Sequence, residues 1–371
     1  MARERVRRGR RTRDEPRVDG EDWVEWGGEV MLAAGFTEGG APYGIGPEEF
    51  RSFNEESEPT AGWARAKRAL RAVFEAWAAP EMAVSIGFVS HVGSGISREI
   101  YAAEVEVTPD SRGQSGLFAV LLPGRDADPD LDARTRKELD LLGRVRAVGF
   151  PFHIPRAIGV CKAAGGLAFV REFVRGIELD LRAGRQPGRP WEVVAGVAAA
   201  VHSLDPGTVA DLAPGTSTRR EHAQAALAAF DGIDAPEADD ARAWAIEHLP
   251  PATPSRLVHG DLLGQNILLR PGAEPAVIDW EYAERGDPAY DLAIVSRGVR
   301  RPFQIDRGLE RLLEAYRTRG GADVTIAQVR VHELCIAARW LGDSLAGRGV
   351  HPPDEQLGRL RGLLRRAAEI Q

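Results

Sequence analysis

Four polar side chains with the chemistry of a metal-dependent transferase fall close together in the second half of the chain: His259, Asp261, Asn266 and Asp279. In phosphoryl transfer, one carboxylate accepts the proton of the acceptor hydroxyl, while an amide oxygen and a second carboxylate hold Mg²⁺ against the phosphates. Asp261 fits the first role, and Asn266 with Asp279 fits the second. The residue types therefore predict a phosphotransferase site.

The elements around these residues are short and alternate with turn signals. An apolar run at 267–269 directly follows Asn266, Pro271 and Gly272 then turn the chain, and a second apolar run at 275–278 leads to Asp279. This pattern predicts a hairpin with polar ligands at both ends. The oxygens of the three side chains would then line one pocket.

Three motifs in this stretch resemble the aminoglycoside phosphotransferase family of kinase-like small-molecule kinases. They are HGDLLGQNIL at 259–268, VIDWE at 277–281 and GDPAYDLA at 286–293. The resemblance implies transfer of the γ-phosphate of ATP, or of another nucleoside triphosphate, to a hydroxyl of a small molecule with Mg²⁺. The acceptor would be an antibiotic such as an aminoglycoside or macrolide, or a metabolite such as an amino alcohol or sugar. It also implies that His259 and Asp291 support the catalytic loop rather than react.

Other interpretations of the same residues stay open. Asp and Asn commonly cap turns and helices, and Asp287 before Pro288 is typical of the start of a helix at 289–299. A nucleotide-binding pseudokinase or scaffold with weak or no transferase activity would also carry these motifs. A protein kinase is disfavoured, because no Ala-Pro-Glu-like activation segment follows Asp279.

A small-residue turn upstream suits phosphate binding. Two strand-like runs within 82–107 flank the turn, in which Gly93, Ser94, Gly95 and Ser97 bring backbone N–H groups close together. The position resembles the nucleotide loop of the family, although hairpins commonly turn on glycine without binding anything.

One expected cation is missing from the next strand. The family resemblance implies a lysine near the end of the strand 116–122, paired with a helix glutamate, which Glu138 on the helix 133–145 matches. The strand instead reaches Leu122 with no basic residue. Arg125 is the nearest basic candidate, although an arginine after Pro-Gly is often solvated.

The following segments complete the expected site. A strand within 168–174 would lead into a hinge where backbone groups of Glu172 and Val174 meet adenine, as the resemblance implies. His202 lies among apolar residues and is predicted to be a core histidine. An acidic run ahead of the catalytic stretch, Glu237, Asp239 and Asp240, either opens a helix or faces a cationic acceptor.

The chain as a whole predicts an α+β protein with a two-lobed protein-kinase-like fold, a β-rich N-terminal lobe and a mainly helical C-terminal lobe. We expect an N-terminal extension at 1–58, the first part of it disordered because it is rich in arginine and poor in apolar groups. The small nucleotide-binding lobe would span 59–174, and the large catalytic and acceptor-binding lobe 175–371.

Composition narrows the remaining possibilities. The 371 residues are 43% hydrophobic with a net charge of −7, which favours a soluble enzyme for neutral or cationic small molecules over a nucleic-acid binder. No apolar run is long enough to span a membrane, and no apolar signal core follows the arginine-rich start. We therefore expect a cytoplasmic location. Two cysteines are too few for a disulfide framework, and the oligomeric state is left open.

Overall fold

The computed structural model describes three strands at 23–26, 29–36 and 42–45, and residues 61–78, 81–94, 98–110, 114–124, 129–211 and 213–370. Three of the predicted site residues, Gly95, Ser97 and Arg125, lie outside these ranges, as does the predicted N-terminal tail. The chain divides into two compact units, 1–55 and 56–371. In the first, β1 (Trp23–Trp26), β2 (Glu29–Phe36) and β3 (Pro42–Ile45) form an antiparallel sheet in that order.

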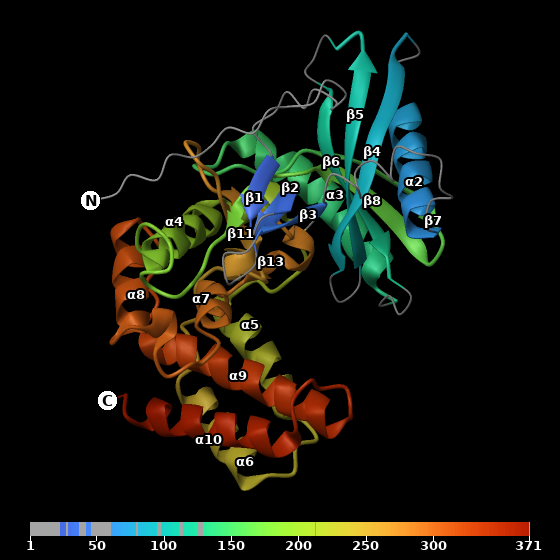
Figure 1. Cartoon of the computed structure of the whole chain (residues 1–371). Helices are drawn as coiled ribbons and strands as arrows, with labels where there is room; N and C mark the ends of the chain where they lie inside the picture. Colours follow the sequence, from blue (N-terminus) through green and yellow to red (C-terminus); the bar gives the residue numbers. More distant parts are fainter. Residues whose placement is uncertain are drawn as a thin grey trace, which may run out of the picture. The chain divides into compact units, whose positions relative to one another are not determined.

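The N-terminal lobe of the second unit is a five-stranded antiparallel sheet with the order β4-β5-β6-β8-β7. Helix α2 covers one face of this sheet and α3 lies on the other (Figure 1). The elements are α2 (Ala61–Trp77), β4 (Ala83–Ser94), β5 (Arg98–Thr108), β6 (Gly116–Pro123), α3 (Leu131–Val148), β7 (Ala157–Ala163) and β8 (Gly166–Glu172).

Alternation along β6 determines which side chains face each helix. Val120 and Leu122 pack with Leu70 and Phe74 of α2, whereas Ala119 and Leu121 pack with the apolar side of α3. Leu122, the position at which the strand lysine was predicted to be missing, therefore points away from α3. A cation on β6 would have to stand at 119 or 121 to reach Glu138.

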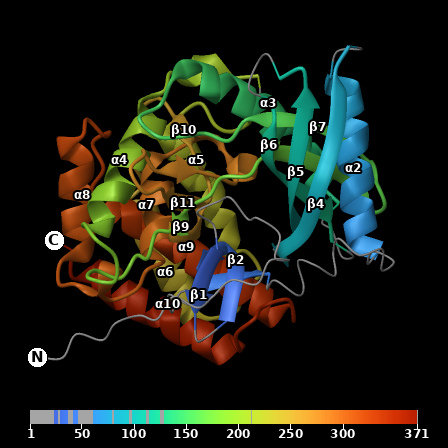
Figure 2. The same cartoon turned by 45° about the horizontal axis from the view of Figure 1, so that its top comes forward.

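The C-terminal lobe is mainly helical, as predicted. Helices α9 and α10 pack against each other, and α6 packs beside them (Figures 1 and 2). The helices are α4 (Pro190–Ser203), α5 (Arg219–Ala226), α6 (Pro236–Glu247), α7 (Pro288–Ser296), α8 (Gly308–Thr318), α9 (Ile326–Leu345) and α10 (Pro353–Ala368). Within the described residues, no helix combines the length and the apolar character needed to cross a bilayer.

Two small sheets in this lobe carry the catalytic stretch. One has the order β12-β11-β9 and the other pairs β10 with β13. The strands are β9 (Ile177–Glu178), β10 (Arg256–Val258), β11 (Ile267–Leu269), β12 (Ala276–Val277) and β13 (Glu284–Gly286). Antiparallel pairing of β11 with β12 confirms the predicted hairpin.

Candidate active site

Asp261, Asn266 and Asp279 converge at the mouth of the β11–β12 hairpin. The Nδ2 of Asn266 donates to both the carbonyl and the carboxylate of Asp261, at 2.8 and 2.9 Å. The backbone N–H of Ile278 donates to the Asn266 carbonyl at 3.0 Å, which holds the next residue, Asp279, beside the loop. The arrangement predicted from the hairpin pattern therefore forms.

His259 joins the two halves of this site. Its Nε2–H donates to the Ile278 carbonyl at 3.0 Å, and its Nδ1 accepts the N–H of Asp261 at 3.3 Å. Burial lowers the pKa of His259, which favours the neutral ring that these two bonds require. With both nitrogens engaged, His259 orients the loop and has no lone pair left for a substrate.

The carboxylate of Asp291 holds the backbone of the same loop. It accepts the backbone N–H groups of His259 and Gly260 at 2.8 and 2.9 Å and a hydrogen bond from His202 at 2.9 Å. Burial opposes ionisation, but the hydrogen bonds from His202 and from the backbone N–H of His259 outweigh it and hold the pKa of Asp291 below its usual range. This fully buried carboxylate thus stays charged.

His202 is buried, as predicted for a core histidine, and it also extends the network. Its Nδ1 accepts from the Tyr316 hydroxyl at 2.7 Å, and that hydroxyl accepts the N–H of Ala322 at 3.1 Å. The catalytic loop is therefore connected through Asp291 and His202 to helix α8. Sequence reasoning missed this connection, because the partners are far apart in the chain.

Gly260 is required by the backbone between His259 and Asp261. It has φ of +81°, and a Cβ at this position would stand 2.3 Å from the carbonyl oxygen of Tyr282. The loop can approach the Tyr282 backbone only without a side chain.

Asp279 has an unusual backbone conformation. Its φ of 62° and ψ of 61° place it in the left-handed region, in which a residue other than glycine is uncommon. Such strain is concentrated at functional sites. Its side chain is 42% exposed, so the carboxylate remains accessible to a ligand.

Burial raises the pKa of Asp261 above its ordinary value, which strengthens the carboxylate as a proton acceptor.

Asp287 has a structural role. Its side chain is fully buried and is held by Arg219 at 2.6 Å and His332 at 3.0 Å. Its carboxylate also accepts the N–H of Ala289, the N-cap role that the sequence indicated.

The expected nucleotide-binding residues occupy the strand ends of the N-terminal lobe. Gly93 and Ser94 close β4 next to a register shift in its pairing with β5. Glu172 ends β8, and its carboxylate receives the Arg156 N–H at 3.0 Å and contacts His153 at 2.9 Å. In the described part of the chain the N–H of Val174 meets no acceptor, so it is available to adenine.

Glu138 is fully buried on α3 and faces the cleft side of the sheet. The predicted partner Arg125 lies outside the described residues, but Arg98 at the start of β5 contacts Glu138 at 3.7 Å. A second arginine, Arg171 on β8, contacts Asp279 at 3.2 Å. Sequence reasoning missed both, because Arg98 begins a strand that also carries three glutamates and Arg171 stands beside Glu172 at the end of β8, so neither stood out in the sequence.

The acidic run ahead of the catalytic stretch opens α6. Glu237 contacts Arg361 of α10 at 2.7 Å, which fits the helix-terminus interpretation rather than a substrate contact.

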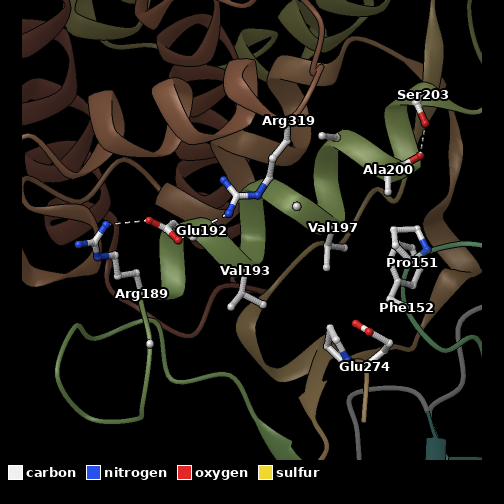
Figure 3. A pocket seen from close by; sticks show the side chains of 14 residues that line it. Pro151, Phe152, Arg189, Glu192, Val193, Val197, Ala200, Ser203, Glu274 and Arg319 are labelled. Carbon is white, nitrogen blue, oxygen red and sulfur yellow. Dashed lines mark hydrogen bonds and ion pairs between the residues drawn. The ribbon is translucent and has the colours of Figure 1, made fainter.

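A separate pocket of about 610 Å³ lies beside α4 (Figure 3). Glu192 contacts both arginines of its lining, Arg189 at 2.9 Å and Arg319 at 3.6 Å, and Glu274 is the second acid. None of the predicted site residues lines this pocket. It touches the catalytic stretch only at Glu274 and Pro275, in the turn before β12.

Comparisons with known proteins agree with this geometry. A profile of the phosphotransferase enzyme family matches residues 107–330, more than half of the chain. The sequence has no significant match among curated proteins.

Solved structures confirm the kinase-like fold. A macrolide 2'-phosphotransferase type I superposes with a TM-score of 0.57 at 18% identity, covering 81% of this chain and 97% of its own. The macrolide 2'-phosphotransferase MphH from Brachybacterium faecium gives 0.54 at 20% identity, with 78% and 97% covered. The aminoglycoside phosphotransferase APH(4)-Ia also gives 0.54, at 16% identity, with 80% and 97% covered. With the family motifs on the hairpin and the profile across both lobes, the chain belongs to the aminoglycoside phosphotransferase family of phosphotransferase enzymes, which act on hydroxyl groups of small molecules.

Proposed function

We propose that this protein transfers the γ-phosphate of ATP to a hydroxyl group of a small molecule. The observation that carries the proposal is the convergence of Asp261, Asn266 and Asp279 at one hairpin mouth, with Asn266 bonded directly to Asp261. In this reaction the acceptor oxygen forms a bond to the γ-phosphorus, the bond from that phosphorus to the β–γ bridging oxygen breaks, and ADP leaves. Asp261 takes the proton of the acceptor hydroxyl.

The donor set suits Mg²⁺. Both hydrogen bonds of the Asn266 amide use its nitrogen, so its Oδ1 is left to act as a ligand together with the exposed carboxylate of Asp279. Within the described residues there is no group of three or more His, Cys, Asp or Glu that would form an all-protein metal site. Mg²⁺ bound by two protein oxygens and the substrate phosphates fits this pattern, and it would supply charge neutralisation.

The nucleotide would lie between the lobes. Val174 offers its N–H to adenine at the hinge, and Glu172 fixes the hinge through its bonds to Arg156 and His153. Gly93 and Ser94 at the end of β4 would meet the phosphates. The sequence assigns Gly95 and Ser97 to the same contact, and both lie outside the described residues. The antibiotic-modifying structural relatives favour an antibiotic or a comparable hydroxylated metabolite as acceptor.

The test is an ATP-consumption screen with purified protein against macrolides, aminoglycosides, amino alcohols and sugars, with a no-acceptor control. A genuine acceptor must yield a product heavier by one phosphate in mass spectrometry. Asp261→Ala should abolish transfer and leave Mg-ATP affinity within about threefold, because a base on the acceptor contributes little to nucleotide binding.

Asp279→Ala is the matched comparison, since it should weaken Mg-ATP binding as well as turnover. Near-normal turnover by Asp261→Ala with a verified acceptor removes Asp261 from the mechanism. If wild type binds Mg-ATP but modifies no acceptor in a broad panel, the result favours a nucleotide-binding scaffold.

A further inference from the structure

Two buried arginines replace the missing basic residue of β6 in the N-terminal lobe. Within the described residues of β6 no lysine or arginine is present, and its positions on the α3 side are Ala119 and Leu121. Arg171 on β8 pairs with Ala119 in the sheet, and Arg98 on β5 pairs with Pro123. Both arginines thus flank the surface from which a strand lysine would project.

The two arginines differ in the number of partners that their guanidinium groups have. Arg98 has three partners on the α3 side: it contacts Glu138 at 3.7 Å and Glu281 at 3.1 Å, and it donates to the Thr135 hydroxyl at 3.1 Å, although its Nε–H has no acceptor among the described residues. Arg171 makes a single ion pair, with Asp279 at 3.2 Å. Within the described part of the chain, its buried Nε–H has no acceptor.

An under-used buried guanidinium indicates an absent anion. A guanidinium has five N–H donors, and a charge removed from water is costly unless it is paired. The Arg171 side chain is only 6% exposed, yet among the described residues one carboxylate oxygen is its only partner. That partner belongs to the proposed metal ligand, so the unused donors lie where substrate phosphates would approach.

Two other basic side chains near Asp279, Lys137 and Arg134, already have partners. Lys137 donates to the carbonyl of Ala283 at 3.0 Å, and Arg134 contacts Glu281 at 3.6 Å. These contacts hold the segment after Asp279 against α3. Arg171 is therefore the cation best placed to bind a phosphate.

We propose that Arg171 is the phosphate-binding residue that takes over the nucleotide contact of the strand lysine, while Arg98 takes over its pairing with Glu138. This assignment rests on the proposed ATP-dependent function. The family resemblance assigns both contacts, with phosphate and with Glu138, to one lysine of β6. Here an arginine of β8 would make the first contact and an arginine of β5 makes the second. Arginine suits the site, because its planar fork binds phosphate oxygens in a bidentate manner.

The test compares ligands with and without phosphates by isothermal titration calorimetry. Arg171→Ala and Arg171→Gln should each weaken Mg-ATP and Mg-ADP binding by about tenfold to a hundredfold, as expected for loss of a charge-assisted contact, and leave adenosine affinity unchanged. Arg171→Gln keeps the length of the side chain without its charge, so it serves if the alanine variant folds poorly. Arg171→Lys should recover part of the loss.

Restoring Mg-ATP affinity with a second substitution gives a further test of the assignment. Leu121 lies on the same face as Ala119, and its sheet partners Ile100 and Phe169 are each two residues from Arg98 and Arg171. Adding Leu121→Lys to the Arg171→Gln variant should restore Mg-ATP affinity at least tenfold, since it returns a cation to the cleft face of β6. The matched control is Arg65→Ala on α2, whose guanidinium donates to the carbonyl of Pro123 at 3.0 Å outside the cleft and which should bind Mg-ATP normally.

Each contrary result has a distinct meaning. Wild type that binds no Mg-ATP overturns the proposed function and this assignment with it. Wild type that binds, with both Arg171 variants within threefold of it, overturns the assignment alone. Parallel loss of adenosine and ATP affinity shows a structural role and also overturns it. If only Arg98→Ala selectively loses ATP affinity, Arg98 is the phosphate-binding residue instead.

Discussion

Replacing Asp291 should damage both the stability and the activity of the protein, because one carboxylate supports three groups of the catalytic lobe. In Asp291→Ala the N–H groups of His259 and Gly260 lose their acceptors, and His202 loses its partner. Each buried donor left without a partner costs about 1–3 kcal/mol. The two backbone groups alone therefore predict a loss of about 2–6 kcal/mol, a large part of the 5–15 kcal/mol typical of a folded domain.

Asp291→Asn is the finer perturbation. Its amide oxygen can accept only one of the two backbone N–H groups, and its NH₂ group faces the other, so the expected loss is about 1–3 kcal/mol. Turnover should fall about a hundredfold or more, because a displacement of the adjacent Asp261 by about 1 Å has that effect on a positioned catalytic group. The Mg-ATP affinity should change little.

The assay is urea unfolding followed by tryptophan fluorescence at pH 7 and again near pH 3, below the ordinary pKa of an aspartate. The lowered pKa of Asp291 means that its contribution is present above the pKa of the unfolded chain and is lost as pH falls through the folded-state pKa. The difference between wild type and variant should therefore be largest at pH 7. Asp211→Asn is the control, since Asp211 is 60% exposed in a surface pair with Arg144 and its replacement should leave the urea midpoint nearly unchanged. An Asp291→Ala variant with the wild-type urea midpoint refutes the reasoning.

Two further predictions concern buried and surface charge. Burial raises the pKa of Glu138 to about 7, so this group's stabilising contribution is complete below its unfolded pKa and is lost as pH rises through about 7. Glu138→Gln should remove that pH dependence, which amounts to at most about 3 kcal/mol of unfolding free energy between pH 4.5 and 7. If the unfolding free energies of the two proteins change with pH in the same way across this range, the prediction is wrong. Reversing the three acidic charges at Glu237, Asp239 and Asp240 should lower stability, because the contact of Glu237 with Arg361 is lost, and should leave the KM of the acceptor unchanged. A raised KM without a change in stability would instead assign these acids to substrate binding.

The local parts of the site were predictable and the long-range parts were not. The β11–β12 hairpin and the position of Asp287 before α7 follow from turn residues and apolar runs a few positions apart, and both form as predicted. Strand β7 was missed, since its sequence AIGVCKA lacks a clear alternation and only its pairing with β8 makes it a strand.

The replacement of the strand lysine shows the limit most clearly. Sequence order suggested the nearest basic residue, Arg125, which lies outside the described residues. The structure also brings Arg98 to Glu138 from one neighbour of β6 and Arg171 to Asp279 from the other. Partners separated in this way leave no periodic trace in the sequence. They become visible only when the order of strands in the sheet is known.

The left-handed backbone of Asp279 has a consequence for how this chain can change over evolutionary time. Besides glycine, asparagine and aspartate are the residues that most readily adopt such a conformation. From an aspartate codon, asparagine and glycine are each reached by a single base change. The substitutions that fit the backbone here therefore include easily reached ones that weaken or remove the proposed metal ligand. At this position the proposed phosphotransfer can therefore be lost through substitutions that the backbone accepts, but glycine would also leave the buried guanidinium of Arg171 without its carboxylate partner.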